Sequence, residues 1–115
     1  MNKRAEGKKY EKIARTYLQQ RGWTIIEENY IFGHKEVDLI AVKAEELCFI
    51  EVKFRYSPAY GKGFEFVDSR KKNNVMTAAK GFLAKRKGYR NFNVTFGIVS
   101  ITGEEIDFRR GYFKW

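Results

Sequence analysis

Apolar residues recur along the chain with two periods, one typical of helices and one typical of strands. Residues 5–21 and 68–87 carry apolar side chains every three or four positions, which is the spacing of an amphipathic helix. The first helix is expected to end at Gly22. The second is expected to begin at an N-cap, Asp68 or Ser69, and to end at Gly88. Glycine is favoured just after a helix, and Asp and Ser are favoured N-caps, so the sequence predicts two helices.

Strand-like runs rich in Val, Ile, Phe and Leu make up most of the remaining chain. They occupy residues 23–31, 36–43, 46–55, 92–101 and 104–110. Between the third strand and the second helix, the segment SPAYGKGFEF (57–66) contains two glycines and the only proline of the chain, which favours a loop. The length and position of this loop suit an element that faces a substrate.

Both faces of the two central strands are apolar, so the sheet needs a layer on each side. Along the first of these strands, strict alternation predicts one set of side chains on each face: Val37, Leu39 and Ala41 against Ile40 and Val42. Two helices that flank a mixed five-stranded sheet meet this need, and 115 residues is the size of one ordinary domain. The sequence therefore predicts a single α/β domain, residues 1–115, with this architecture.

Three charged residues interrupt the central strands at positions where a covered sheet favours apolar side chains: Asp38, Glu51 and Lys53. A symmetric turn between the strands would pair Asp38 with Glu51 and Glu36 with Lys53, with all four side chains on one face. Opposed residues have Cβ atoms about 4.5–5.5 Å apart, so the two carboxylates would repel each other. A hard divalent cation such as Mg²⁺ would convert this repulsion into coordination, with Lys53 beside it to hold a water.

Two other interpretations of these charges stay open. A cluster of surface salt bridges would pair Glu36 with Lys53, and Asp38 with an arginine, at a solvated strand end. In addition, the turn KAEE lacks the Asn-Gly or Asp-Gly dipeptide that fixes a hairpin register. A slip of one residue would move the two carboxylates to opposite faces of the sheet.

The charge of the chain is strongly positive, with 23 Lys and Arg against 14 Asp and Glu, a net charge of +9. No acidic residue lies between Asp68 and Glu104, and this window holds a series of basic residues: Arg70, Lys71, Lys72, Lys80, Lys85, Arg86, Lys87 and Arg90. A field of one sign concentrates a polyanion and favours phosphate contacts through counterion release. Nucleic acid is the expected partner, and a solubilising helix face is the alternative.

Two simpler features narrow the class of protein further. No run of apolar residues approaches the roughly 20 that span a bilayer, and no apolar segment follows the basic N-terminal residues, so we expect a cytoplasmic protein with no membrane partner. The only cysteine, Cys48, lies inside an apolar run and cannot form an internal disulfide. We expect it to be a buried core thiol.

A resemblance to known proteins rests on the run VDLIAV, followed after a short turn by CFIEVKFR. These runs resemble the PD-(D/E)XK nuclease signature, with Asp38 and Glu51 as the acids and Lys53 as the lysine. The residue before the first acid, often proline, is Val37 here. The runs YEKIARTYLQQRGWTIIEENY, KEVDLIA, FVDSRKKNNVMTAAKGFL and FGIVSI further resemble the YraN-like family of small bacterial proteins. Those proteins are similar to archaeal Holliday junction resolvases, so the resemblance implies a restriction-endonuclease-like fold.

The resemblance also implies a set of roles at the centre of the sheet. Asp38 and Glu51 would bind Mg²⁺ or Mn²⁺, with the main-chain carbonyl of Val52 as a third ligand. Lys53 would assist the water that attacks the phosphodiester.

Three further residues match functional positions of the family. Glu11 matches an acid on the first helix and lies at the edge of that helix's apolar stripe, where a solvated glutamate is the alternative. Glu36 matches the glutamate of a Gly-Glu-Ile-Asp pattern, in which Lys35 replaces the glycine here. Lys71 matches a lysine that opens the second helix, and its stem is directed toward the core side, so its amine can reach the active end of the sheet. A solvated first turn is the alternative for Lys71.

The chain departs from the family near its end, where Thr95, Phe96 and Gly97 replace a common Arg-Phe-Asp. We expect this loss to affect the structure rather than the metal pair, because the central acids and lysine remain.

Together these features predict a Mg²⁺-dependent endonuclease that acts on branched or junction DNA as a homodimer. The basic residues expected to bind DNA are Arg70, Lys71, Lys72, Lys85 and Arg86. The competing hypothesis is a non-catalytic nucleic-acid-binding or adaptor protein that keeps the fold, because a nuclease fold does not by itself establish nuclease activity.

Overall fold

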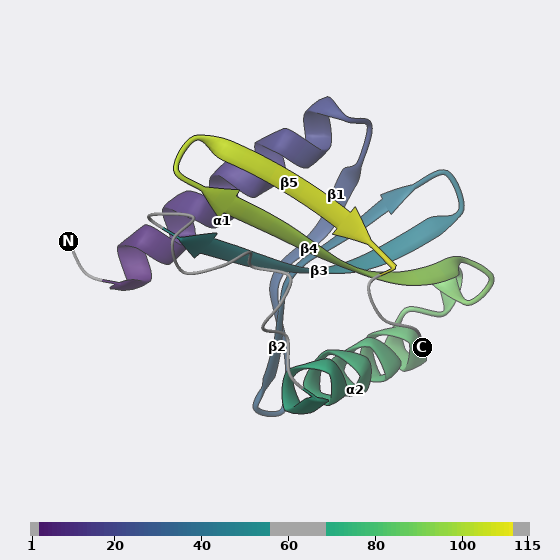
Figure 1. Ribbon diagram of the computed structural model, residues 1–115. Helices are drawn as coiled ribbons and strands as arrows, with labels where there is room; N and C mark the ends of the chain where they lie inside the picture. Colours follow the sequence, from purple (N-terminus) through teal and green to yellow (C-terminus); the bar gives the residue numbers. More distant parts are fainter. Residues whose placement is uncertain (1–2, 56–68, 112–115) are drawn as a thin grey trace.

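The computed structural model describes residues 3–55 and 69–111, which form two helices, one short 3-10 helix and five strands (Figure 1). In chain order they are α1 (Lys3–Gln20), β1 (Thr24–Phe32), β2 (Lys35–Lys43), β3 (Glu46–Arg55), α2 (Ser69–Lys85), the 3-10 helix η3 (Lys87–Tyr89), β4 (Asn93–Thr102) and β5 (Glu105–Arg110). The predicted helices and strands are confirmed to within two residues at each end. The predicted loop 57–66 and the predicted N-cap Asp68 lie outside the described residues.

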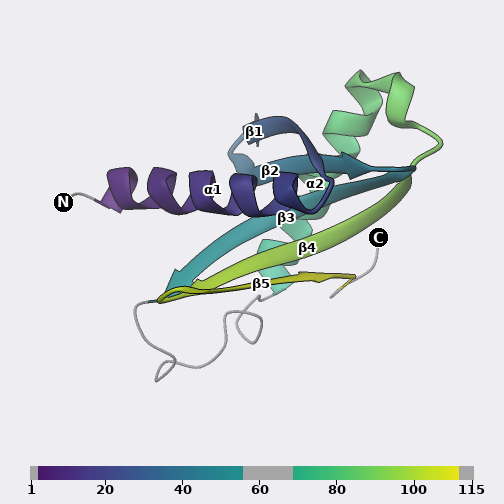
Figure 2. The same ribbon diagram turned by 90° about the horizontal axis from the view of Figure 1, so that it is seen from above.

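The five strands form one sheet in the order β1-β2-β3-β4-β5. Neighbouring strands are antiparallel except β3 and β4, which are parallel because the chain crosses over through α2 between them. The two helices cover opposite faces of the sheet (Figure 1, Figure 2). The predicted architecture, a mixed five-stranded sheet flanked by two main helices, is therefore confirmed. Neither of the described helices has the length and apolar character to cross a membrane.

Each face of the sheet packs against one helix and forms its own apolar cluster. The buried side chains on the α1 face include Ala14, Leu18, Leu39, Ala41, Cys48 and Ile50. Those on the α2 face include Val75, Phe82, Ile40, Leu47, Phe49 and Phe96. Full burial of one Leu, Ile or Phe contributes about 1.5–3 kcal/mol, so this two-sided packing holds the central strands in place. Cys48 is a buried core thiol as predicted, and burial raises its pKa to about 12.

The hairpin of β2 and β3 has the predicted register near its turn, since Leu39 pairs with Ile50 and Lys43 with Glu46. In the turn, Ala44 has a φ of 53°, a left-handed conformation that costs a residue with a Cβ about 1–2 kcal/mol. The register holds although the turn lacks Asn-Gly, because the strand side chains on both faces are fixed by packing against a helix.

Pairing between β2 and β3 ends at Leu39 and Ile50. Beyond this point β2 remains paired only to β1, and β3 remains paired only to β4. The two strands therefore separate at Asp38 and Glu51, and we call this opening the fork. Figure 1 shows the first half of β2 beside α2, whereas β3 continues toward the N-terminal half of α1.

The fork corrects two predictions about these strands. The predicted ladder pairs of Asp38 with Glu51 and of Glu36 with Lys53 are wrong, because the strands have already separated at these residues. Strict alternation also places Val37 with Leu39 and Ala41, whereas Val37 packs in the cluster on the α2 face. The reason is that β2 leaves β3 at the fork and follows β1 around α2, and this twist turns Val37 toward the helix.

Candidate functional site

Asp38 lies at the fork, where it replaces a missing strand partner. Its Oδ2 accepts a hydrogen bond from the main-chain N–H of Val52, with 2.8 Å between the two atoms. Because β2 and β3 no longer pair here, this N–H has no partner in the ladder, and a buried N–H without a partner is costly. The hydrogen bond therefore fixes the Asp38 carboxylate against β3.

Glu51 is the second acid of the fork, and its side chain is only 11% exposed. Its Oε1 lies 3.0 Å from Nζ of Lys71, which comes from the first turn of α2. Its Oε2 is buried and has no hydrogen-bond partner within the described part of the chain. A buried polar atom without a partner costs about 1–3 kcal/mol, and more when it is charged, so Oε2 marks a place where a cation would be stabilised.

Burial and neighbouring negative charge raise the pKa of Asp38 to about 7. Burial has the largest effect, followed by the charge of Glu51, and Glu11 adds a weaker contribution. The Val52 N–H and the Lys71 amine lower the pKa of Asp38 by less. The raised pKa means that the cations of the fork do not fully stabilise the ionised Asp38 carboxylate, and a divalent cation bound there would stabilise it.

Lys71 is the counter-ion of Glu51. Burial lowers the pKa of Lys71, but the charge of Glu51 and the hydrogen bond to it outweigh this effect, so the pKa is raised. The charges of Asp38 and Glu36 raise it further. The amine of Lys71 therefore lies at the fork, rather than in solvent at the start of the helix.

Glu11 brings α1 into the same electrostatic neighbourhood. Burial raises the pKa of Glu11, and a hydrogen bond from the Asn29 side chain opposes this rise. Nearby acids raise the pKa further, namely Glu36, Glu28 and Glu51. Asn29, in β1, has a φ of 53°, a left-handed conformation that asparagine tolerates better than most residues. The sequence pattern did not point to Asn29, because one asparagine inside a strand-like run carries no functional signal.

Glu36 and Lys53 lie at the edge of the fork. Glu36 is exposed on β2, and Lys53 is partly buried on β3. Strand alternation puts Lys53 on the same face of the sheet as Glu51. Glu36 acts at a distance, through the effect of its charge on the pKa values of Glu11 and Lys71.

The oxygen atoms of the fork fit a hard divalent cation such as Mg²⁺ or Mn²⁺. Asp38 and Glu51 offer carboxylate oxygens, and the carbonyl of Val52 points to the same side of β3 as its N–H, toward the fork. Within residues 3–55 and 69–111, no three His, Cys, Asp or Glu side chains are grouped closely enough to hold a metal by themselves. Mg²⁺ is usually bound by one or two carboxylates, with water and phosphate oxygens in its other positions, so an open site with two carboxylates suits it.

The predicted DNA-binding residues fall into two groups at opposite ends of α2. The groups are Arg70, Lys71 and Lys72 near the fork, and Lys85 and Arg86 at the far end. A helix rises 1.5 Å per residue, so the groups are about 20 Å apart. At the far end the Lys85 amine lies 5.8 Å from the ring centroid of Phe32, and the Arg86 guanidinium lies 5.2 Å from that of Phe82. The basic window is therefore not one continuous patch.

Gly97 occupies the position at which the resemblance to the YraN-like proteins led us to expect an aspartate. A Cβ at this position would lie 2.9 Å from the Phe108 ring and 3.1 Å from Sγ of Cys48. Both neighbours belong to the cluster on the α1 face, whereas Glu51 contacts Lys71 on the α2 face. An acid at position 97 would therefore meet a packed core, on the opposite side of the sheet from Glu51.

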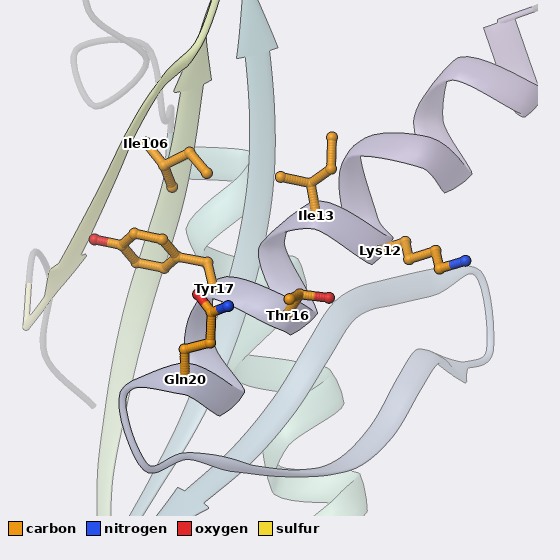
Figure 3. Close-up of a pocket in the computed structure, with 6 residues that line it drawn as sticks. All are labelled: Lys12, Ile13, Thr16, Tyr17, Gln20 and Ile106. Carbon is orange, nitrogen blue, oxygen red and sulfur yellow. The ribbon is translucent and has the colours of Figure 1, made fainter.

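Two of the pockets in the described part of the chain line α1, and the sequence pattern did not point to either. The larger, about 340 Å³, lies between α1 and β5 and is lined by Lys12, Ile13, Thr16, Tyr17, Gln20 and Ile106 (Figure 3). The smaller, about 230 Å³, is lined by Lys8, Glu11, Lys12, Arg15, Glu28 and Asn29. The smaller pocket shares Glu11 and Asn29 with the site. The spacing of Lys8, Glu11, Lys12 and Arg15 along the helix is the signal that could have revealed it.

Comparison with known proteins places the chain in a family. Residues 10–101 match the model of the uncharacterised protein family UPF0102. The chain belongs to this family. The UPF0102 protein FN1370 of Fusobacterium nucleatum is 36% identical over 107 residues, which cover 93% of this chain and 89% of that protein. A UPF0102 protein of Cytophaga hutchinsonii is 39% identical over 98 residues, which cover 84% and 83% of the two chains.

These matches confirm the predicted resemblance to the YraN-like proteins, which are the UPF0102 family. The matched range of UPF0102 includes all of the candidate catalytic residues, from Glu11 to Lys53, and also Lys71. The family description names no activity, so a function has to be argued from the chemistry of the fork.

Proposed function

We propose that this chain is a Mg²⁺-dependent DNA endonuclease of the PD-(D/E)XK type that acts on branched or junction DNA. The observation that carries the proposal is the state of the fork. Asp38 and Glu51 come close enough for one charge to raise the pKa of the other, and one buried oxygen of Glu51 has no hydrogen-bond partner among the described residues. Such a pair costs stability unless a cation binds it, which makes it a poor structural element and a good metal site.

The residues of the fork have distinct roles in this proposal. Asp38, Glu51 and the Val52 carbonyl are the groups that would hold the Mg²⁺ or Mn²⁺ ion. A divalent ion bound there would supply a Lewis acid for the phosphate and would lower the pKa of a coordinated water. Lys53, on the face of Glu51, positions the attacking water, and Lys71 forms the ion pair that holds the Glu51 carboxylate in place.

Glu11 and Glu36 surround this centre with further negative charge. Glu11 has a raised pKa and a hydrogen bond from Asn29, so it can accept or hold a proton near the substrate. Glu36 is exposed, and its charge raises the pKa of Lys71. Both residues are proposed to assist the reaction rather than to bind the metal directly.

Nucleic acid as the substrate is supported by the net charge of +9 and by the cations at the start of α2. Phosphate contacts supply most of the sequence-independent affinity of proteins for DNA. The restriction to branched or junction DNA, and a homodimer that would cut two strands symmetrically, rest on the resemblance to junction resolvases. Sedimentation of the protein, alone and with junction DNA, tests the homodimer, and a monomer under both conditions would contradict it.

A second function has one observation in its favour. The ion pair of Lys71 with Glu51 already offsets part of the negative charge of the fork. Such internal compensation is expected of a nucleic-acid-binding or adaptor protein that keeps the fold without catalysis. Asp38, in contrast, takes part in no ion pair within the described part of the chain, and its pKa stays raised. The Asp38 carboxylate, which no ion pair among the described residues offsets, favours the enzyme.

The test of the proposed function is cleavage of a panel of DNA substrates in Mg²⁺ or Mn²⁺. The panel contains duplex, single-stranded, flap and four-way-junction DNA, and the proteins compared are the wild type, Asp38→Asn and Asp107→Asn. Asp107 is an exposed acid on β5, so Asp107→Asn makes the same chemical change at a position away from the fork. We expect cleavage by the wild type and by Asp107→Asn, and none by Asp38→Asn. If the wild type cleaves no member of the panel with either metal, the nuclease proposal is wrong and the adaptor function remains.

A further inference from the structure

A pocket of about 230 Å³, lined by charged and polar residues, lies between α1 and β1. Its β1 residues, Glu28 and Asn29, lie beside Asp38 in the sheet, because Glu28 pairs with Leu39 and Tyr30 pairs with Val37. Two of its lining residues, Glu11 and Asn29, also belong to the candidate site, because they are hydrogen-bonded to each other and Glu11 raises the pKa of Asp38. The charge of the pocket residue Glu11 thus acts on Asp38, one of the two proposed metal ligands, although the pocket lies on a different helix from the basic window.

Three basic side chains line this pocket from one face of α1, namely Lys8, Lys12 and Arg15. Residues three and four apart lie on the same face of a helix, so the three form a row. Arg15 is held by Glu28, with its Nη1 3.0 Å and 2.9 Å from the two carboxylate oxygens. Lys8 and Lys12 are exposed, and neither forms an ion pair within the described part of the chain.

Lys8 and Lys12 are exposed and form no ion pair with described residues, whereas both acids of the pocket already interact with neighbouring side chains. Glu11 is only partly exposed and bonded to Asn29, and Glu28 is neutralised by Arg15. Figure 3 shows the Lys12 side chain directed away from Tyr17 and Ile106, so its amine is turned away from the apolar pocket between α1 and β5. A phosphate that approaches the mouth of the polar pocket would therefore meet lysine amines first.

We propose that Lys8 and Lys12 bind the sugar–phosphate backbone of the strand that is cleaved, next to the scissile bond, so that this strand runs along α1 past Glu11. This inference rests on the proposed nuclease function and specifies the path of its substrate. Lys8 and Lys12 are about 6 Å apart along the helix axis, given a rise of 1.5 Å per residue. Charges on one strand of duplex DNA follow at about 3.4 Å along the axis, so the pair spans about two phosphates.

The strand path is tested first by a pair of charge-matched double variants. Lys8→Gln with Lys12→Gln removes two cations beside the pocket, and Arg21→Gln with Lys43→Gln removes two exposed cations near the turn of the β2–β3 hairpin, at the opposite end of the hairpin from the fork. All four residues are exposed, so both variants should fold, which their melting curves check. Binding to the DNA panel is measured by fluorescence anisotropy in EDTA, over a range of salt concentrations.

We expect the α1 variant to bind about tenfold more weakly and to show a slope of log Kd against log salt that is smaller by about 1.8, or 0.9 per lost duplex phosphate contact. The control variant should change less in both respects. Equal losses in the two variants would mean that only net charge matters, and an α1 variant that binds like the wild type would equally overturn the inference.

Crosslinking locates the strand directly. The chain has a single cysteine, Cys48, which is buried, so Lys12→Cys and Lys85→Cys each provide one accessible thiol for a photo-crosslinker. We expect Lys12→Cys to crosslink the cleaved strand within about three nucleotides of the scissile bond, given the spacing of about 3.4 Å per nucleotide. Crosslinks at that distance from Lys85→Cys, and none from Lys12→Cys, would overturn the proposed path.

The two proposals fail in different ways. If the wild type cleaves DNA but the α1 variant binds and crosslinks as the control does, the strand path is wrong and the nuclease function stands. If the wild type binds DNA through Lys8 and Lys12 but cleaves nothing, the backbone site stands as part of an adaptor. A wild type that binds no DNA of the panel rejects both.

Discussion

The two ends of the β2–β3 hairpin are built from the same two strands and differ in almost every other respect. At the turn end, the backbones pair from Leu39 and Ile50 to Lys43 and Glu46, and the side chains between them lie under both helices. At the fork, the backbones separate, and the carboxylate of Asp38 accepts the N–H that the ladder no longer uses. A closed ladder leaves no main-chain donor for a buried carboxylate, so buried charge is tolerated where the ladder opens. The turn end thus provides stability, and the fork is the place where the proposed chemistry would occur.

The largest expected effect is on catalysis at the fork. Asp38→Asn removes one charge and one metal ligand while it keeps the shape and an oxygen that can accept from Val52. We expect single-turnover cleavage of the best DNA substrate to fall on the order of 10³-fold, about 4 kcal/mol of transition-state stabilisation. Asp107→Asn should cleave at the wild-type rate. Cleavage by Asp38→Asn at a similar rate would remove the fork from the mechanism.

A truncation at the turn end should affect stability instead. Leu47 pairs with Val42 next to the turn and is fully buried under α2, so Leu47→Ala should lower the free energy of unfolding by about 2–5 kcal/mol, as large-to-small changes in cores do. If the fork binds Mg²⁺ as proposed, Mg²⁺ should raise the melting temperature of the wild type, and it should also raise that of this variant because the fork acids remain. Urea unfolding and thermal melting with and without Mg²⁺ provide the two measurements. A variant that kept its stability but lost the response to Mg²⁺ would contradict the division between the two ends.

The raised pKa of Asp38 makes a smaller prediction about pH. The carboxyl has a pKa of about 7 in the folded protein and an ordinary, lower value when unfolded, so its ionisation opposes folding. This cost is absent below the unfolded pKa, grows as the pH rises, and is complete once the pH passes the folded pKa. Asp38→Asn avoids it, so the variant should gain about 1–3 kcal/mol on the wild type between about pH 4 and pH 8. Urea unfolding without metal at several pH values measures this gain, and a constant difference would show that Asp38 titrates normally.

The smallest expected effect concerns Lys71. Lys71→Gln leaves Glu51 without its counter-ion, but the lysine side chain is 43% exposed, so solvent screens the pair. We expect a loss of about 1 kcal/mol in the free energy of unfolding without metal, and a smaller loss when Mg²⁺ is present. Arg70→Gln, an exposed neighbour that loses the same charge, is the matched control. A larger loss for Arg70→Gln would place the important charge elsewhere.

Much of the turn end could be predicted from the sequence. Apolar residues on both faces required a helix on each side, and a symmetric two-residue turn gave the register that places Leu39 opposite Ile50. Those rules are local, and the interior of a covered sheet obeys them. The same rules failed at Val37, because strict alternation assumes that a strand keeps both of its neighbours.

The fork itself could not be predicted, although its acids were named. No local pattern states where β2 leaves β3, since this depends on how β1 and β2 together wrap around α2. The α1 row was missed for a different reason. Residues 3–15 contain six basic and two acidic residues, but only helical spacing shows that Lys8, Lys12 and Arg15 share one face. The roles of the site residues stay predictions until cleavage and metal binding are measured.

The hydrogen bond from Val52 to Asp38 makes one backbone amide a spectroscopic reporter of the fork. An amide that donates to a side chain, rather than to a neighbouring strand, has a proton environment that depends on the charge of that side chain. In a ¹H–¹⁵N correlation spectrum, the Val52 resonance should therefore move with the ionisation of Asp38 and move again when a divalent cation binds. The amides of Leu47 and Phe49, deep in the paired region, should not move. A single cross-peak would then follow the occupancy of the site without any substrate.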